Sequence, residues 1–229
     1  RRSTMYRSDQ DKGALMDTKL LLAGPPILLV LGALLVFAVE PARVLPRLDL
    51  APNYQLTGQD AQPVSGTDFL GSVVLYSFVD AQCDEACAAT LDLMRALEPE
   101  TRKEWAAPVR LVTVVVEPVN LERLQAIAAT TGASSDTWSV LGGDETASRL
   151  VRQGFRVPVA VRADGTSRVD PLLVLVDPAG VVRAVYRAPL PAPAVVQDDL
   201  RVLEKEIAGA RGVKRLLYEG LHRLTCRVP

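Results

Sequence analysis

The apolar positions of the chain form three patterns along its length. An uncharged run rich in Leu, Val, Ala and Ile extends from Leu20 to Val39, about the length of a helix that crosses a bilayer. Shorter continuous apolar runs at 71–79, 109–116 and 172–176 are typical of strands that are covered on both faces. Between these runs, apolar residues recur at helical spacing. The pattern predicts one membrane span followed by a mixed α/β domain.

The order of the elements follows from these runs and from the turn and capping residues. Asn120 is expected to cap a helix, Gly154 to end one, and Asp177–Gly180 to form a turn. Alternating strands and helices indicate a central mixed sheet with helices on both faces. The expected elements are a hairpin at 54–57 and 62–65, strands at 71–79, 109–116, 138–141, 172–176 and 181–186, and helices at 84–97, 120–131, 144–154 and 197–208.

The charges that flank the apolar run predict its orientation. Five lysines and arginines precede the run and two follow it closely, so the positive-inside rule places the N-terminus in the cytoplasm. We therefore expect a single-pass protein of the cell membrane, in contact with the lipid bilayer, with its main domain extracytoplasmic. The expected parts are a cytoplasmic tail (1–18), a transmembrane helix (19–39), a linker (40–52), a globular domain (53–210) and a C-terminal amphipathic helix (211–229).

The charge balance and the cysteine count narrow the candidate chemistry. A net charge of −1 without a clustered basic face gives no reason to expect a nucleic-acid partner. The chain has three cysteines and a single histidine, His222, which reads as an ordinary polar residue far from the other candidates. Cys226 reads equally as a free thiol, an intermolecular bridge or a small packing residue. The two remaining cysteines therefore carry the functional argument.

Cys83 and Cys87 are spaced as Cys-x-x-x-Cys where a predicted strand gives way to a predicted helix. Residues four apart at a helix start face the same side, with Cβ atoms about 5–6 Å apart. A slightly unwound first turn would bring them within the 3.5–4.5 Å or so of a disulfide, which persists in an oxidising compartment. The same spacing lets two thiolates bind Cu(I). Copper delivery, thiol–disulfide exchange and a structural disulfide all remain open.

Charged residues surround this pair in the sequence. The amides at the helix N-terminus favour a thiolate, whereas Asp80, Asp84 and Glu85 oppose it by like-charge repulsion. Asp80 and Glu85 are expected to be solvated charges. We therefore expect thiols less acidic than those of a strongly oxidising dithiol protein.

Four stretches carry a resemblance to a known family. They are Tyr54–Asp60 (YQLTGQD), Gly71–Phe78 (GSVVLYSF), Cys83–Cys87 (CDEAC) and Leu173–Gly180 (LVLVDPAG). From about residue 53 to residue 208 the chain resembles the Sco/SenC family of membrane-anchored copper and redox proteins. The resemblance implies a thioredoxin-like fold for 53–210. It also implies either copper delivery to cytochrome oxidase or thiol redox work on the copper-site cysteines of that oxidase.

The resemblance also implies site residues, with departures. Family members bind copper through two cysteines and a histidine just before the strand that matches 172–176, where this chain reads Arg-Val-Asp-Pro. The implied copper or redox residues are Cys83 and Cys87. In place of the missing histidine, Asp170 could offer an oxygen, a ligand for which Cu(I) has little preference. Pro171 stands where many thioredoxin-like proteins carry a cis-proline. Glu117 replaces the aspartate that the family has after its second buried strand.

The expected function follows from the resemblance and these departures. The chain is expected to be an accessory or assembly subunit of a membrane respiratory electron-transport complex, whose subunits are its partners. The alternative is a thiol–disulfide oxidoreductase, or a copper chaperone, that matures the copper site of cytochrome oxidase.

Overall fold

A computed structural model describes residues 44–209, apart from 84, 134–135 and 162–166. The predicted tail (1–18), span (19–39) and C-terminal helix (211–229), together with His222 and Cys226, lie outside the described residues. In the part of the chain that is described, no helix combines the length and the apolar character that crossing a bilayer requires.

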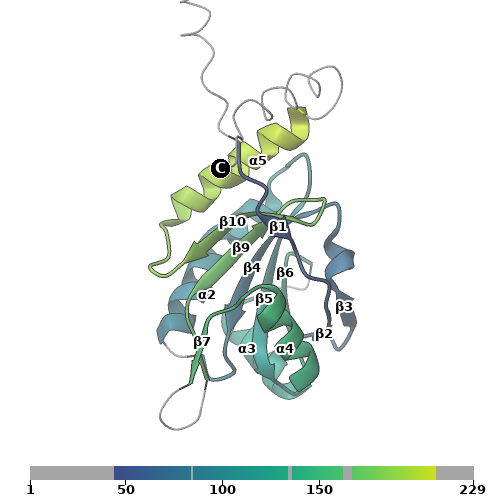
Figure 1. Ribbon diagram of the computed structural model, residues 1–229, viewed down its shortest axis with the longest axis vertical. Coiled ribbons are helices and arrows are strands. Elements are labelled where there is room, and N and C mark those ends of the chain that lie inside the picture. Colours follow the sequence, from purple (N-terminus) through teal and green to yellow (C-terminus); the bar gives the residue numbers. More distant parts are fainter. Residues whose placement is uncertain (1–43, 84, 134–135, 162–166, 210–229) are drawn as a thin grey trace, which may run out of the picture. The chain divides into compact units, whose positions relative to one another are not determined.

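A mixed sheet forms the centre of the domain (Figure 1). Strands β4, β5 and β6 are parallel to one another, and the remaining strands pair antiparallel. Within the described residues the sheet has eight strands, which in their order across it are β1 (Asp49–Leu50), β10 (Val181–Arg187), β9 (Leu172–Val176), β4 (Val73–Val79), β5 (Val109–Pro118), β6 (Trp138–Gly143), β2 (Gln55–Gly58) and β3 (Pro63–Ser65). A separate hairpin is formed by β7 (Val159–Val161) and β8 (Ser167–Val169).

Helices cover both faces of the sheet. Helices α2 (Glu85–Leu97), α3 (Leu121–Thr131) and α5 (Pro193–Gly209) contribute to one apolar core, and α4 (Glu145–Gly154) contributes to the other. Two short 3-10 helices, η1 (Gly66–Phe69) and η2 (Glu98–Arg102), complete the elements of the described part. The predicted mixed α/β class, a central sheet with helices on both sides, is confirmed.

Strand β4 shows why the apolar runs are continuous. All seven of its residues are buried, and neighbours along it face opposite cores: Leu75 packs with α2 and α5, whereas Tyr76 packs on the side of α4. Successive side chains of a strand point to opposite faces, so a strand with a core on each side has no solvent-facing position.

Most predicted elements form close to their predicted bounds, and the differences have physical causes. Helix α5 begins four residues earlier than predicted, at Pro193, because proline suits the first turn of a helix. Gly154 ends α4 without a left-handed cap. A Cβ there would lie 2.5 Å from the Cβ of Pro52, so the glycine permits a close approach. The linker contains the unpredicted strand β1.

Three segments meet at one edge of the sheet. Strands β4 and β5 are parallel and in register, so residues 80–83 and 119–120, which follow these strands, leave the sheet at the same edge. Strand β9 is antiparallel to β4, with Ser77 opposite Leu173, so residues 169–171 enter the sheet there. Helix α2 starts from this edge, which therefore carries Cys83, Cys87, Asp170 and Pro171.

Candidate functional site

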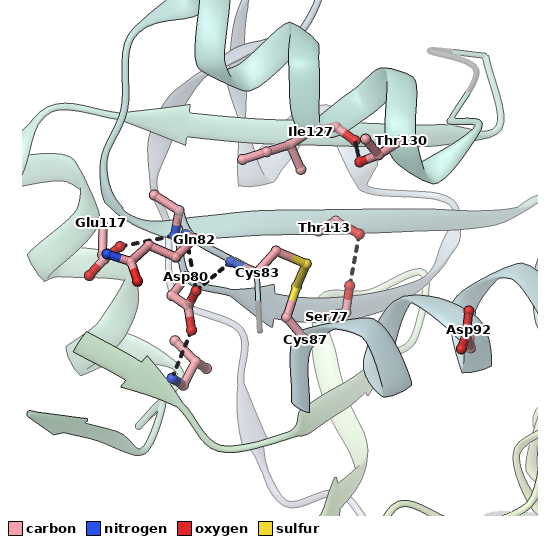
Figure 2. Close-up of a disulfide and its surroundings, with 12 residues drawn as sticks. Ser77, Asp80, Gln82, Cys83, Cys87, Asp92, Thr113, Glu117, Ile127 and Thr130 are labelled. Atoms are coloured by element: carbon pink, nitrogen blue, oxygen red, sulfur yellow. Dashed lines mark hydrogen bonds between the residues drawn. A yellow bond between two sulfur atoms is a disulfide. The ribbon is translucent and has the colours of Figure 1, made fainter. Parts of the chain in front are cut away.

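Cys83 and Cys87 form a disulfide at this edge, with their Cα atoms 4.9 Å apart (Figure 2). Cys87 lies in the first turn of α2 and is only 4% exposed, whereas Cys83 precedes the helix and is half-buried. The pairing that the spacing permitted is therefore present. The two residues also differ in burial, and the one before the helix is the more exposed.

The chain reaches this disulfide through an unusual backbone conformation. Cys83 has φ +54°, a left-handed value that residues with a side chain rarely adopt and that costs on the order of 1 kcal/mol or more. The Cys83 N–H donates to Oδ1 of Asp80 at 2.7 Å, and the Gln82 N–H donates to the same oxygen at 3.1 Å. A local side-chain-to-backbone turn thus holds Cys83 in the strained conformation.

The prediction that Asp80 is a solvated charge is wrong. Its side chain is 0% exposed instead of solvated, and its second oxygen, Oδ2, accepts from the Val169 N–H at 3.4 Å. Figure 2 shows the carboxylate between the Gln82–Cys83 backbone and that second contact. One signal in the sequence could have indicated this role. Asp80 precedes Gln82 by two residues and Cys83 by three, and an aspartate at this spacing often accepts from the following backbone N–H groups in a turn.

The peptide groups of Ala81 are held by two further residues. The Ala81 N–H donates to Oε2 of Glu117 at 2.9 Å. Its carbonyl accepts from Nε and Nη2 of Arg123, at 3.0 and 2.5 Å. Glu117 is the penultimate residue of β5 and Arg123 lies in the first turn of α3, so the loop from Asp80 to Cys83 is tied to two neighbouring elements. No motif or spacing in the sequence points to this role of Arg123.

Asp170 and Pro171 lie at the same edge but form no metal centre with the cysteines. The Asp170 carboxylate accepts from Nη2 of Arg168 at 2.8 Å. Within the described residues, no three His, Cys, Asp or Glu side chains gather as a metal site requires. The cis bond of the described residues precedes Pro189, so the Asp170–Pro171 bond is trans and the suggested cis-proline at 171 is not observed.

A buried polar chain crosses the strands beneath this region. The Ser77 and Thr113 hydroxyls are 2.8 Å apart, and the Trp138 indole N–H donates to Thr113 at 2.9 Å. All three side chains are buried, and Figure 2 places Ser77 and Thr113 in the surroundings of the disulfide. Trp138 packs in the core, and its indole N–H has a hydrogen-bond acceptor.

A central sheet covered on both faces, with a disulfide where a buried strand gives way to a helix, is the arrangement of a thioredoxin-like domain. The chain matches the family model described as SCO1/SenC over residues 43–204. The chain therefore belongs to the SCO1/SenC family. The comparison with curated proteins found no match.

Solved structures with the same fold include several Sco proteins. The Arabidopsis thaliana ScoI structure with copper bound has a TM-score of 0.59 and 14% identity, covering 68% of this chain and 99% of that one. A SCO1/SenC family lipoprotein from Bacillus anthracis has a TM-score of 0.57 and 23% identity, covering 71% and 99%. BsSco, described as having a disulfide switch and as a member of the Sco family of cytochrome c oxidase assembly proteins, has a TM-score of 0.56 and 22% identity, covering 71% and 98%.

Proposed function

We propose that this protein is a membrane-anchored assembly or accessory factor of a respiratory electron-transport complex, and that it acts by thiol–disulfide exchange at Cys83 and Cys87. The observation that carries the proposal is the asymmetric disulfide, with Cys83 half-buried and Cys87 4% exposed at the start of α2. Family membership and the assembly role printed for BsSco supply the class of partner.

The exchange transfers two electrons from a partner dithiol to the Cys83–Cys87 disulfide. A partner thiolate attacks Sγ of Cys83, because that residue is the more accessible one, and the electron pair of the broken bond leaves with Cys87, which then takes up a proton. A second partner thiolate then attacks the partner sulfur in the mixed disulfide and displaces Cys83, which is protonated in turn. The partner dithiol becomes a disulfide, and this chain gains two electrons and two protons. The reverse sequence reduces a partner disulfide.

Copper delivery is the second candidate, with Cu(I) as cargo. Two thiolates freed by reduction would suit this soft ion in a two-coordinate arrangement. Asp170 is paired with Arg168, and the described residues offer no third ligand of the His, Cys, Asp or Glu type. The donor set therefore fits two-coordinate Cu(I) better than Cu(II), and it supports exchange more strongly than copper storage.

The proposal places the domain outside the cytoplasm, anchored by the span predicted at 19–39. The uncharged run and the excess of cations before it support this topology. In membrane vesicles of known orientation, the domain should be digested by protease only when the extracytoplasmic side is exposed. Digestion from the cytoplasmic side would contradict the placement.

Trapping a mixed disulfide tests the exchange reaction. A Cys87→Ala variant leaves Cys83 able to attack a partner but unable to be released, so a covalent adduct should accumulate on non-reducing gels. Peptide mapping should find Cys83 joined to a cysteine of a respiratory-complex subunit. The Cys83→Ala variant is the matched control and should trap much less. Equal trapping by both variants, or by neither, would argue against the proposal.

A Cu(I) titration separates the two candidates. The reduced protein is titrated with Cu(I) against a competing chelator, beside a Cys83→Ala/Cys87→Ala variant. A trapped mixed disulfide without tight stoichiometric binding of Cu(I) supports thiol–disulfide exchange as the function. Tight binding of one Cu(I) by the wild type alone, without trapping, would replace exchange with copper delivery as the function.

A further inference from the structure

Asp80 is a buried acid whose contacts converge on the loop before the disulfide. Its side chain is 0% exposed, and Oδ1 accepts from the backbone N–H groups of Gln82 and Cys83, at 3.1 and 2.7 Å. Oδ2 accepts from the Val169 N–H at 3.4 Å, which ties the same carboxylate to strand β8. Burying an acid is unfavourable unless it is hydrogen-bonded. Two of the three N–H donors to Asp80 belong to the loop that carries Cys83.

The hydrogen bonds bear on how readily the disulfide closes. Cys83 has φ +54°, which an unrestrained cysteine would leave once the bond to Cys87 is broken. The Asp80 bond to the Cys83 N–H does not involve the sulfurs, so reduction leaves its donor and acceptor in place, and the bond would oppose that relaxation. Two groups held in their reacting geometry have a higher effective concentration, so this hold favours the disulfide over the dithiol.

The charge of Asp80 acts in the same direction. A carboxylate in a buried position interacts with nearby charges through a lower effective dielectric than water. Reduction creates thiols three residues and seven residues further along the chain, at Cys83 and Cys87, and any negative charge on them is opposed by the carboxylate. The disulfide carries no charge and is not opposed.

We infer that Asp80 is a positioning residue that biases the Cys83–Cys87 pair toward the disulfide, by holding the Cys83 amide and by placing a fixed negative charge beside the pair. The inference deepens the proposed exchange function and rests on it. Asp80 acts through the Cys83–Cys87 pair and not on a substrate. Its effect is therefore visible in the reduction potential.

Reduction potentials of three proteins test the inference. Wild type, Asp80→Asn and Asp80→Ala are equilibrated with dithiothreitol or glutathione buffers at one pH, and the dithiol fraction is read by alkylation and mass spectrometry. Asparagine keeps the acceptor oxygen and removes the charge, so its equilibrium should shift about tenfold toward the dithiol, or about 30 mV upward. Alanine removes the charge and the hydrogen bonds, so its shift should be larger.

Asp177→Asn is the matched control. Asp177 is also buried and accepts backbone N–H groups, from Ala179 and Val181, but it follows β9 at the opposite end of the sheet from Asp80. This change is expected to lower the free energy of unfolding. The thiol–disulfide equilibrium constant should stay within about twofold of the wild-type value. The fold of each variant is checked by circular dichroism in both redox states.

A second readout removes the dependence on a single assay. The oxidised and reduced forms of each protein are unfolded in urea, and the difference between their unfolding free energies should change by the amount that the potential predicts. The inference would be overturned if the thiol–disulfide equilibrium constant of Asp80→Asn lay within twofold of the wild-type value, or if it shifted toward the disulfide. Either result would leave the proposed exchange intact. A wild-type pair that no thiol buffer reduces in the folded state would overturn both.

Discussion

Cys83 and Cys87 differ in the surroundings of their side chains although they are bonded to each other. Cys87 sits within the core that α2 forms with the sheet, and Cys83 lies at its margin. In the reduced protein, iodoacetamide should therefore modify Cys83 on the order of ten times faster than Cys87, because reaction requires access to the thiolate. Peptide mapping after short exposures measures the ratio. Faster modification of Cys87 would contradict the order of attack proposed above.

At Gly142 in β6, strand propensity and side-chain packing predict opposite effects of an alanine substitution on stability. Alanine suits a strand better than glycine, but a Cβ at this position would lie 2.3 Å from Cγ1 of Val119. We expect Gly142→Ala to lower the free energy of unfolding by about 1–3 kcal/mol, as overpacking does. Adding Val119→Ala should recover part of this loss, measured by urea unfolding. A Gly142→Ala protein as stable as wild type would show that the loop carrying Val119 moves at little cost.

At the scale of elements, Arg183 joins three parts of the chain. It lies in β10 and is 4% exposed, and its guanidinium contacts Asp177 at 3.1 Å and also Glu206 of α5. The same group donates to the carbonyls of Leu45 and Pro46, at 2.6 and 3.1 Å. The start of the described chain is thus fixed to the last helix through one buried cation.

Removing this cation should be costly. Arg183→Met leaves two acids without their buried partner, and we expect a loss of about 3–5 kcal/mol in the free energy of unfolding. Arg201→Met is the control, because its pair with Asp198 is exposed and should contribute less than about 1 kcal/mol. Urea unfolding measures both changes. Equal losses for the two variants would contradict the view that burial makes the Arg183 network important.

The sequence predicted elements whose signal is local and missed those that depend on distant partners. Strand β4 and helix α3 follow from an apolar run and from the Asn120 cap, whose side chain accepts from the Arg123 N–H as expected. Strand β1 has two exposed residues and exists because it pairs with β10. Strands β7 and β8 have three residues each, too few for a periodic pattern to show in the sequence.

The candidate site was predictable to a similar extent. The spacing of Cys83 and Cys87 at a strand–helix junction permitted their pairing as one of several alternatives, and the structure contains that disulfide. The burial of Asp80 did not follow from the sequence, because an aspartate before a loop is ordinarily solvated and only the fold brings Val169 and the Cys83 amide onto its two oxygens. Arg123 was missed for the same reason, since its acceptor lies 42 residues away in the sequence.

At the scale of the whole domain, a buried tyrosine pair links stability to alkaline pH. The hydroxyls of Tyr54 and Tyr76 are 3.1 Å apart, and the two residues are 6% and 2% exposed. Burial raises the pKa of Tyr76 to about 12, and burial raises the pKa of Tyr54 further. The fold therefore favours the protonated phenols, and this preference has no effect below the unfolded-state pKa near 10.

Stability should consequently fall as the pH rises above about 10. The unfolded chain loses phenol protons that the folded protein retains, so the free energy of unfolding should drop by about 1.4 kcal/mol per pH unit for each tyrosine, up to its folded pKa. In Tyr76→Phe the slope between pH 10 and 12 should be about half as steep. Urea unfolding at several pH values measures it. Identical slopes in the two proteins would contradict the assignment.

A redox titration of the folded wild-type protein tests whether the disulfide can take part in exchange. Cys83–Cys87 should open and close reversibly in thiol buffers at a potential above about −300 mV, with circular dichroism unchanged throughout. A bond that is reduced only when the domain unfolds would mark it as a structural bridge and contradict the account.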